Sequence, residues 1–427
     1  RTVVDIAANI THHCCCCRHA TVRSLPCRSV AARHQKAYSS IIDANVTTFL
    51  TGAILYGLGQ GPVRGFATTL MIGIVSSFFT AVFITRLIIS WLANKGQIDK
   101  FTFSFAYTSN LLHSVNFDFL GHRRLFYTIS LIFISIGFLL MVKQGGLNLG
   151  VDFTGGKSYV VAFSQPVEAT GLKTRLADSF GEQSTEVKTY GANNVVKITT
   201  SYLSQEETPE ADEQVKGTLI KSITNYTGLT YVDSATPNKE GTFTIASAAK
   251  VGASIAGDIQ TAAKKSILLS LIMIFGYIVI RFQRWQFGLA AVIALLHDSL
   301  VVFASFAIAR ALGYAYEIDQ VFIAAVLTII GYSINDTVVV FDRIREKIRL
   351  QVSSNFLQIA NSAINETLSR TLITSLTTLM AVLVLFVWGG EVLRGFSFAL
   401  LVGVIFGTYS SICIATPLVI DFSRKYR

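Results

Sequence analysis

Two ionisable side chains lie within predicted membrane-spanning helices, where a charge is costly and usually functional. Asp336, in GYSINDTVVVF, is expected about six residues, or ~9 Å, from the cytoplasmic end of its helix. Arg370, in NETLSRTLITS, is expected just inside the same end of the next helix. A carboxylate whose pKa depends on the distance to an arginine can carry protons, so the pair predicts ion-coupled transport. A static ion pair that only fixes helix packing is the alternative.

Two further ionisable residues, His297 and Asp298, lie near the middle of the apolar run 285–309 and are weaker candidates. They could extend an ion relay, or they could form a structural pair satisfied by the backbone or by Ser299. No loop shows a nucleophile with a base and an orienting partner, so an enzyme has no predicted site. A solvated face at the membrane boundary is expected for a charged group that follows Asp336: Asp342, Arg343, Arg345, Glu346 and Lys347.

The elements that position these residues are predicted to be membrane-spanning helices. Of the 427 residues, 51% are hydrophobic and only 15% are charged, which is typical of a membrane protein. About 20 helical residues cross a bilayer, and eight apolar runs approach that length. They lie near 40–59, 65–85, 125–142, 266–280, 285–309, 318–341, 371–388 and 395–420. The fourth is short and is expected to depend on snorkelling of Lys264 and Lys265.

The net charge of +10 is explained by orientation in a membrane better than by nucleic-acid binding. Basic residues concentrate in alternate loops, at 86–124, 281–284 and 342–367, and in the tail after residue 423. The intervening short loops carry only Arg64, Arg310 and Arg394. The positive-inside rule therefore predicts a cytoplasmic C-terminus and a long extracytoplasmic segment at 143–262.

The first 35 residues differ in composition from the rest of the chain. They hold five of the six cysteines, including the run THHCCCCRH, and show no apolar periodicity. Four consecutive cysteines lack the paired spacing of a zinc site, so metal binding is the weaker hypothesis and no metal is predicted. A non-native, frameshift-like segment is the stronger one, with native sequence resuming near Lys36.

An internal repeat relates residues 47–84 to residues 377–414 at a constant offset of 330. Identical residues recur without a gap, among them Arg64, Gly65 and Phe66 against Arg394, Gly395 and Phe396. Both copies run in the same direction, as in the parallel repeats of several transporter classes. Gly403 and Gly407 are expected to serve ordinary close packing. Asp43 has an uncharged counterpart, Ile373, and is expected to be structural.

Residues 143–262 have the composition of a soluble domain. Strand-like and helical patterns follow in the order strand, helix, strand, strand, helix, strand, which predicts a ferredoxin-like α+β unit. Its start, LNLGVDFTGGKS, fails as a phosphate-binding loop because Val151 occupies a position that needs glycine. Gly155 and Gly156 instead predict a tight turn into a strand.

These segments together resemble the SecD and SecF protein-export proteins of bacteria, which belong to the RND superfamily. LNLGVDFTGG, YSINDTVVVFDRIRE, TLSRTLITSLTTL and GFSFALLVGVIFGTYSSICIATPL resemble SecF over residues 117–421. SSIIDANVTTFLTGAILYGLGQGPVRGFA resembles the last two helices of SecD. The resemblance implies a fused SecDF form that lacks most of its SecD half. It also implies an RND-like fold with about eight spanning helices in parallel repeats and one ferredoxin-like extracytoplasmic domain.

The resemblance further implies a role in protein translocation across the cytoplasmic membrane, driven by the proton motive force. Asp336 and Arg370 match the family's ion-path residues, and Asp152, Phe153, Thr154, Gly155 and Gly156 form its signature. The implied partners are the SecY–SecE–SecG channel, YajC, membrane lipid and an unfolded preprotein, without nucleic acid. No cofactor is expected, and the coupling ion is a proton or a sodium ion. The acid expected opposite Asp336, in a SecD helix, would fall within residues 1–35.

Two other functions compete with this one. A proton-coupled exporter of lipids or small molecules fits any repeat with a buried acid, and a structural scaffold fits the helices alone. The expected division of the chain is a non-native segment (1–35), two SecD-like helices (36–92), a cytoplasmic linker (93–122), a first SecF-like helix (123–142), the extracytoplasmic domain (143–262), five SecF-like helices (263–421) and a cytoplasmic tail (422–427).

Overall fold

The computed structural model describes residues 26–59, 61–95, 116–180, 185–190, 192–204, 206, 208–233, 240–314, 316–350 and 355–423. The cysteine-rich run at 11–19 lies outside the described residues, as do most of the expected linker and the tail after residue 423.

Eight helical spans within the described part are long and apolar enough to cross a membrane, as the apolar runs predict. The chain is therefore a polytopic α-helical membrane protein. The spans are built from α2 (Pro26–Leu58), α3 (Gly61–Phe79) with η1 (Thr80–Ile84) and α4 (Thr85–Asn94), α5 (Arg123–Lys143), α9 (Ala253–Phe282), α10 (Trp285–Ala311), α11 (Gln320–Leu350), α12 (Phe356–Trp388), and α13 (Gly390–Ser410) with η4 (Ser411–Ala415) and α14 (Thr416–Phe422).

Several helices extend beyond their apolar runs. The fourth span is not short: α9 has 30 residues, so no length deficit needs Lys264 or Lys265 to compensate. Most of the segment expected as a loop at 342–367 is also helical, because α11 continues to Leu350 and α12 already begins at Phe356. A hydropathy pattern marks only the residues that cross the apolar part of the membrane. The helices continue beyond it through amphipathic residues that pack at the ends of the bundle. The helix α2 likewise begins at Pro26, ten residues before the expected return of native sequence.

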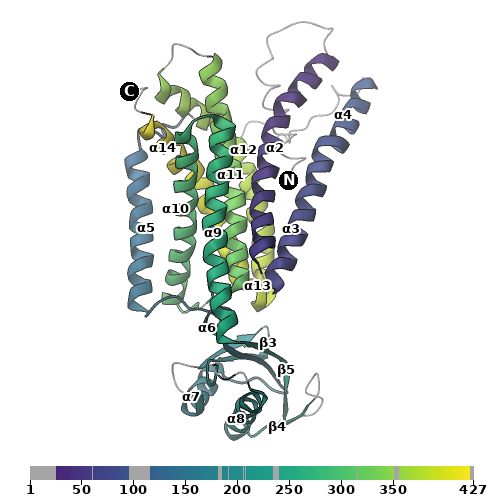
Figure 1. The fold of residues 1–427 in the computed structure, drawn as a ribbon, viewed down its shortest axis with the longest axis vertical. Coiled ribbons are helices and arrows are strands. Elements are labelled where there is room, and N and C mark those ends of the chain that lie inside the picture. The colour runs from purple at the N-terminus through teal and green to yellow at the C-terminus, as the bar shows by residue number, and fades with distance from the viewer. Residues whose placement is uncertain are drawn as a thin grey trace.

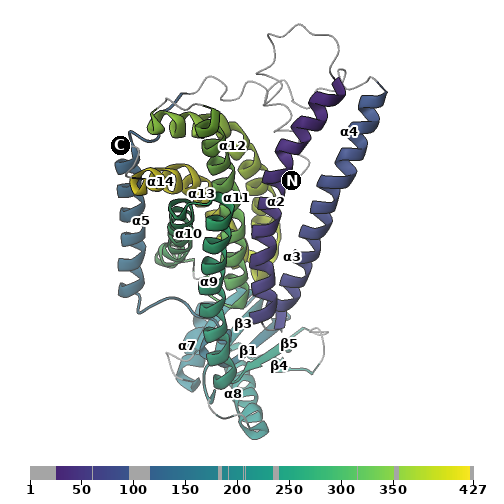
Figure 2. The ribbon, with the colours of Figure 1, turned by 45° about the horizontal axis from the view of Figure 1, so that its top comes forward.

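The helix α11 is the central element of the bundle. It is buried along most of its apolar length, and it packs against α2, α10, α12 and α13. Figure 1 shows it between α10 and α2, with the α+β domain at one end of the bundle and the C-terminal end of the chain at the other. In Figure 2, α3 and α4 lean away from the other helices.

The two copies of the repeat share an irregularity in their second helices. Both contain a π-helical turn, η1 at Thr80–Ile84 and η4 at Ser411–Ala415, one residue from the offset that relates the sequences. At each turn a threonine hydroxyl donates to the carbonyl five residues earlier, Thr85 to Thr80 and Thr416 to Ser411, both at 3.0 Å. This shared π-turn supports the repeat independently of residue identity.

The glycines of the second copy allow close packing on α11, as expected. A Cβ atom at Gly403 would lie 2.3 Å from side-chain atoms of Ile329, and one at Gly407 would lie 3.1 Å from Ser333 Cβ. These contacts let α13 approach α11 closely.

The extramembrane domain has the predicted ferredoxin-like topology. It comprises β1 (Gly156–Phe163), α7 (Ala169–Phe180), β2 (Thr185–Tyr190), β3 (Ala192–Thr200), α8 (Pro209–Thr227), β4 (Thr230–Tyr231) and β5 (Thr242–Val251). The sheet order is β2-β3-β1-β5-β4, with antiparallel pairs throughout except the short edge strand β4, which is parallel to β5. Phe163, Leu172, Leu219 and Phe243 lie in its own buried core, so the unit packs as a domain.

Candidate ion-coupling site

Asp336 lies on α11 within a group of buried hydroxyls. It is 5% exposed, and Ser375 of α12 donates a hydrogen bond to its Oδ2 at 3.4 Å. Ser375 Oγ in turn accepts from Tyr332 Oη at 3.2 Å and from Thr408 Oγ1 of α13 at 2.6 Å. Each hydroxyl can donate and accept, so the group can reorient when the charge on the carboxyl changes.

Arg370 lies on the same helix as Ser375, five residues earlier, or ~7.5 Å along the axis. It is partly buried, and its carbonyl accepts a hydrogen bond from Thr374 Oγ1 at 3.1 Å. The helices that carry Asp336 and Arg370 pack together. The pairing of their charged groups stays a prediction.

Asp298 forms a second buried carboxylate centre. The residue is fully buried on α10, and its Oδ2 accepts hydrogen bonds from Ser333 at 2.6 Å and from Ser410 at 2.8 Å. Its Oδ1 lies 3.0 Å from Nδ1 of His297. The alternative partner Ser299 is excluded, because its hydroxyl donates to the Leu295 carbonyl.

The imidazole of His297 is only partly satisfied. Among the described residues its buried Nε2 has no hydrogen-bond partner, although Nδ1 is held by Asp298. A buried nitrogen without a hydrogen-bond partner costs about 1–3 kcal/mol.

The two carboxylate centres share two helices. On α11, Tyr332 donates toward the Asp336 centre and its neighbour Ser333 donates to Asp298. On α13, directly before the π-turn η4, Thr408 donates to Ser375 of the Asp336 centre and Ser410 donates to Asp298. A small rotation or slide of either helix therefore changes the hydrogen bonding of both carboxyls.

At the bundle end opposite the domain, charged residues form a network. Local sequence patterns do not reveal this network. Asp43 of α2 is 2% exposed and accepts from Tyr277 Oη at 2.6 Å and from Arg281 Nε at 2.8 and 2.9 Å. Arg281 Nη2 lies 3.8 Å from Asp342, which pairs with Arg345 at 2.8 Å. Asp43 thus ties the first repeat to α9 and α11.

On the other side of α11, basic residues of this helix pair with an acidic residue of α12. Arg343 and Lys347 both pair with Glu366, the latter at 2.5 Å, and Arg343 also pairs with Glu346 at 2.7 Å. Lys347 is only 9% exposed. The face expected to be solvated is therefore a half-buried contact between helices, because α12 begins early enough to cover it.

The signature residues form the entry to the domain. Asp152 and Phe153 belong to a one-turn helix, α6 (Val151–Thr154), and β1 starts at Gly156. Gly155 and Gly156 have φ of +72° and +129°. A Cβ at Gly156 would lie 2.5 Å from the Thr200 carbonyl oxygen, so the tight turn requires glycine there.

Comparisons with known proteins match this fold and these residues. The family described as "Protein export membrane protein SecD/SecF, C-terminal" matches residues 231–425, and the SecD/SecF GG motif matches residues 144–167. Protein translocase subunit SecF of Rhodothermus marinus is 41% identical over 317 residues, covering 74% of this chain and 96% of the relative. The chain belongs to the SecD/SecF family.

The fused relatives extend over more of the chain. Protein translocase subunit SecDF of Thermus thermophilus is 33% identical over 395 residues, which cover 90% of this chain but 48% of the relative. A crystal structure of the translocon-associated SecDF from Thermus superposes on the whole chain with a TM-score of 0.79 and 28% identity, covering 52% of that structure. The chain thus spans about half the length of its SecDF relatives, and the resemblance to SecD and SecF is confirmed.

Proposed function

We propose that this chain is a non-enzymatic protein translocase subunit of the SecF or SecDF kind, which uses an ion gradient to promote movement of unfolded protein across a membrane. The observation that carries the proposal is Asp336, a buried carboxyl on the central helix, within a network of hydroxyls that can each donate and accept. Relatives named as translocase subunits supply the process in which this ion chemistry is used.

The coupling step is a change in charge at Asp336. An ionised carboxylate is costly in an apolar interior unless a cation or strong donors compensate it. The 3.4 Å hydrogen bond from Ser375 is long and compensates little of the charge by itself. In the proposal, the ionised state also attracts Arg370, one to two helical turns from Ser375 on α12. A protonated Asp336 is neutral, can donate to Ser375, and releases that attraction. Ion binding thereby changes how α11 packs on α12.

His297 and Asp298 act as a second, weaker ion site in this proposal. Ser333 and Ser410 stabilise the Asp298 carboxylate, and the free Nε2 of His297 can accept a proton. Because Ser333 and Tyr332 are neighbours on α11, loading of one centre alters donors available to the other.

The orientation and the partners follow the same reasoning. The basic residues Arg281, Arg343, Arg345 and Lys347 lie on helix ends opposite the domain, which supports a cytoplasmic location for that end. The domain then faces outward, where it would meet the emerging preprotein. SecY–SecE–SecG and YajC are the expected partners, in the bacterial cytoplasmic membrane. The coupling ion is a proton, with sodium as the alternative.

Replacement of Asp336 by asparagine tests the proposal. Vesicles that carry the translocon and this protein are energised by a proton gradient, and export of a secreted protein is measured. Asp336→Asn should abolish the gradient-dependent part of export, whereas Asp178→Asn, on the exposed face of α7, should leave it unchanged. Full export by Asp336→Asn at normal protein levels would refute ion coupling. Loss of lipid efflux instead of export would favour the exporter function. A sodium gradient that replaces the proton gradient would identify the ion.

A further inference from the structure

The signature segment Asp152–Gly156 joins the outer end of α11 to the central strand of the domain. Asp152 Oδ2 accepts a hydrogen bond from the backbone N–H of Gln320, the first residue of α11, at 3.1 Å. Asp319 Oδ1 accepts from Phe322 N at 2.8 Å. The first turn of a helix leaves its N–H groups without partners in the helix, and carboxylates stabilise them. The start of α11 is thus held by one carboxylate of its own and one from the signature.

A backbone clasp reinforces this contact. Ile318 N donates to the Asn148 carbonyl, and Gly150 N donates to the Ile318 carbonyl, both at 2.8 Å. These bonds form an isolated parallel bridge between Leu149 and Ile318. The segment that leads into α6 therefore runs beside the segment that leads into α11, and neither can move along the other without breaking backbone hydrogen bonds.

The domain side of the junction is equally short. Only Phe153, Thr154 and Gly155 separate Asp152 from β1, a central strand of the sheet. The neighbouring strand β3 adds a second tie, because Lys197 Nζ lies 3.1 Å from Glu317 Oε2. Burial and the nearby Glu317 act oppositely on Lys197, with a net rise in its pKa, so the lysine is charged at neutral pH. Two central strands are thus fastened to residues 317–320.

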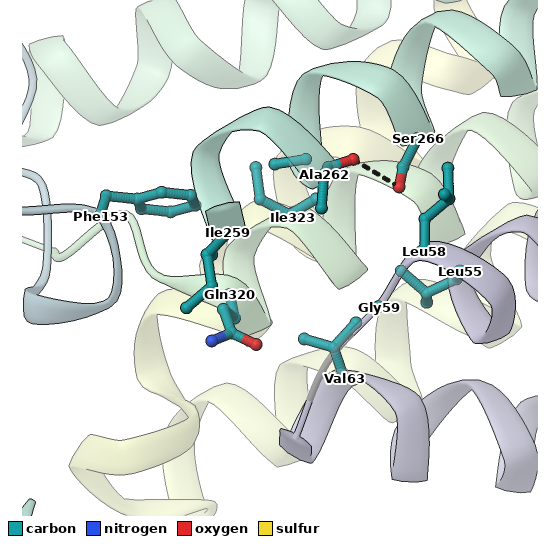
Figure 3. Close-up of a pocket in the computed structure, with 11 residues that line it drawn as sticks. Leu55, Leu58, Gly59, Val63, Phe153, Ile259, Ala262, Ser266, Gln320 and Ile323 are labelled. Atoms are coloured by element: carbon teal, nitrogen blue, oxygen red, sulfur yellow. Dashed lines mark hydrogen bonds between the residues drawn. The ribbon is translucent and has the colours of Figure 1, made fainter. Parts of the chain in front are cut away.

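Phe153 anchors the junction in the bundle. It is 6% exposed, and its carbonyl accepts from Gln260 Nε2 of α9 at 2.5 Å. Figure 3 shows its ring pointing toward Ile259 of α9 and Ile323 of α11, at the edge of a pocket that Leu55 and Val63 line from the first repeat. The first repeat, α9, α11 and the entry to the domain therefore meet at this point.

We infer that the DFTGG segment is the mechanical joint through which movement of α11 reaches the extramembrane domain, with Asp152 as a positioning residue. The inference rests on the proposed function, in which a charge change at Asp336 shifts α11. Gln320 and Asp336 lie on one continuous helix, 16 residues or ~24 Å apart. A helix transmits a tilt or slide over such a distance, and the short clasp passes it to β1.

Spin-label distances test the joint separately from export. After replacement of the native cysteines by alanine, labels are placed at Lys221→Cys on α8 and Leu312→Cys after α10, both exposed. The distance is measured with Asp336 and with Asp336→Asn, which mimics the neutral state. We expect two different distance distributions in the otherwise unchanged protein.

Asp152→Ala should reduce that difference by roughly a quarter or more, since it removes one of the four bonds that tie residues 317–320 to the domain entry and to β3. Asp152→Asn, which keeps an acceptor oxygen, should preserve the difference, as should the control Asp178→Ala. The inference would be overturned if Asp152→Ala kept the whole distance difference between the Asp336 and Asp336→Asn proteins. It would also be overturned if Asp336 and Asp336→Asn gave the same distance in the otherwise unchanged protein. If export is insensitive to Asp336→Asn while the distances behave as expected, the proposed function fails and the joint stands.

Discussion

Removal of the Asp43 carboxylate should destabilise the bundle more than its peripheral position suggests. The carboxylate is almost completely buried and receives three hydrogen bonds from Tyr277 and Arg281. In Asp43→Ala, Arg281 keeps its charge but loses its closest partner. Breaking one side of a buried ion pair costs ~3–5 kcal/mol, mainly because the other charge stays uncompensated.

The expected value lies at the lower end of that range. Arg281 has a side chain 20% exposed, and Asp342 lies 3.8 Å away, so part of its charge remains screened. We therefore expect a loss of about 3 kcal/mol in the free energy of unfolding. Asp43→Asn keeps an acceptor and loses only the charge, so it should cost about half as much.

A double-mutant cycle measures this interaction directly. Unfolding free energies in detergent micelles are compared for Asp43→Ala, Arg281→Met and both together, and the coupling energy should exceed ~1.5 kcal/mol. The exposed pair Arg175–Asp178, with side chains 63% and 66% exposed, is the matched control and should give less than ~1 kcal/mol. A coupling energy at Asp43 no larger than at this surface pair would refute the reasoning.

Two further predictions concern the junction with the domain. Gly156→Ala should destabilise the domain by roughly 2–4 kcal/mol, because φ is +129° and the new Cβ would meet the Thr200 carbonyl. Hydrogen exchange of the backbone amides of β1 and β3 measures this loss. Unchanged exchange rates would contradict the prediction. Burial, and then the charges of Asp152 and Glu317, raise the pKa of Asp319 to about 6. The folded state thus keeps a proton between pH ~4 and ~6 that the unfolded state has lost, so stability should fall by up to about 3 kcal/mol as pH rises through that window. Asp319→Asn should abolish this dependence, and an unchanged pH profile in that variant would refute the assignment.

The sequence was sufficient for the features that depend on local composition. Apolar length predicted eight spans, and alternating strand and helix patterns predicted the ferredoxin-like order, both of which the structure has. Asp336 was identifiable because a carboxylate inside an apolar run is rare in itself. Each of these signals is read from neighbouring residues.

Features that depend on distant residues could not be predicted in this way. The hydroxyls that hold Asp298 come from positions 35 and 112 residues away, and Asp43 meets Arg281 across 238 residues. Asp43 looked structural because its repeat counterpart is Ile373, and no pattern in α2 points to α9. The ends of α11 and α12 were missed for a related reason, since ion pairs between these helices stabilise their polar extensions. The N-terminal extension of α9 was missed because it packs against α6, where Gln260 donates to the Phe153 carbonyl.

The contacts of α11 explain how one buried charge could act on the whole chain. Its two sides carry opposite charges toward different neighbours. Asp342 lies beside Arg281 of α9, which binds Asp43 of α2, whereas Arg343 and Lys347 bind Glu366 of α12. Asp336 lies between these ion pairs and the joint at Asp152. The ties to the first repeat include ion pairs at the bundle end and a hydrogen bond from Thr48 Oγ1 of α2 to the Gly331 carbonyl at 3.1 Å. Those to the second repeat include the hydroxyl network at Asp336 itself. The hydroxyls that form this network lie on α12 and α13 as well as on α11. In the proposed function, a change of charge at Asp336 therefore acts first on the contact with the second repeat, and α11 should move with the first repeat relative to the second.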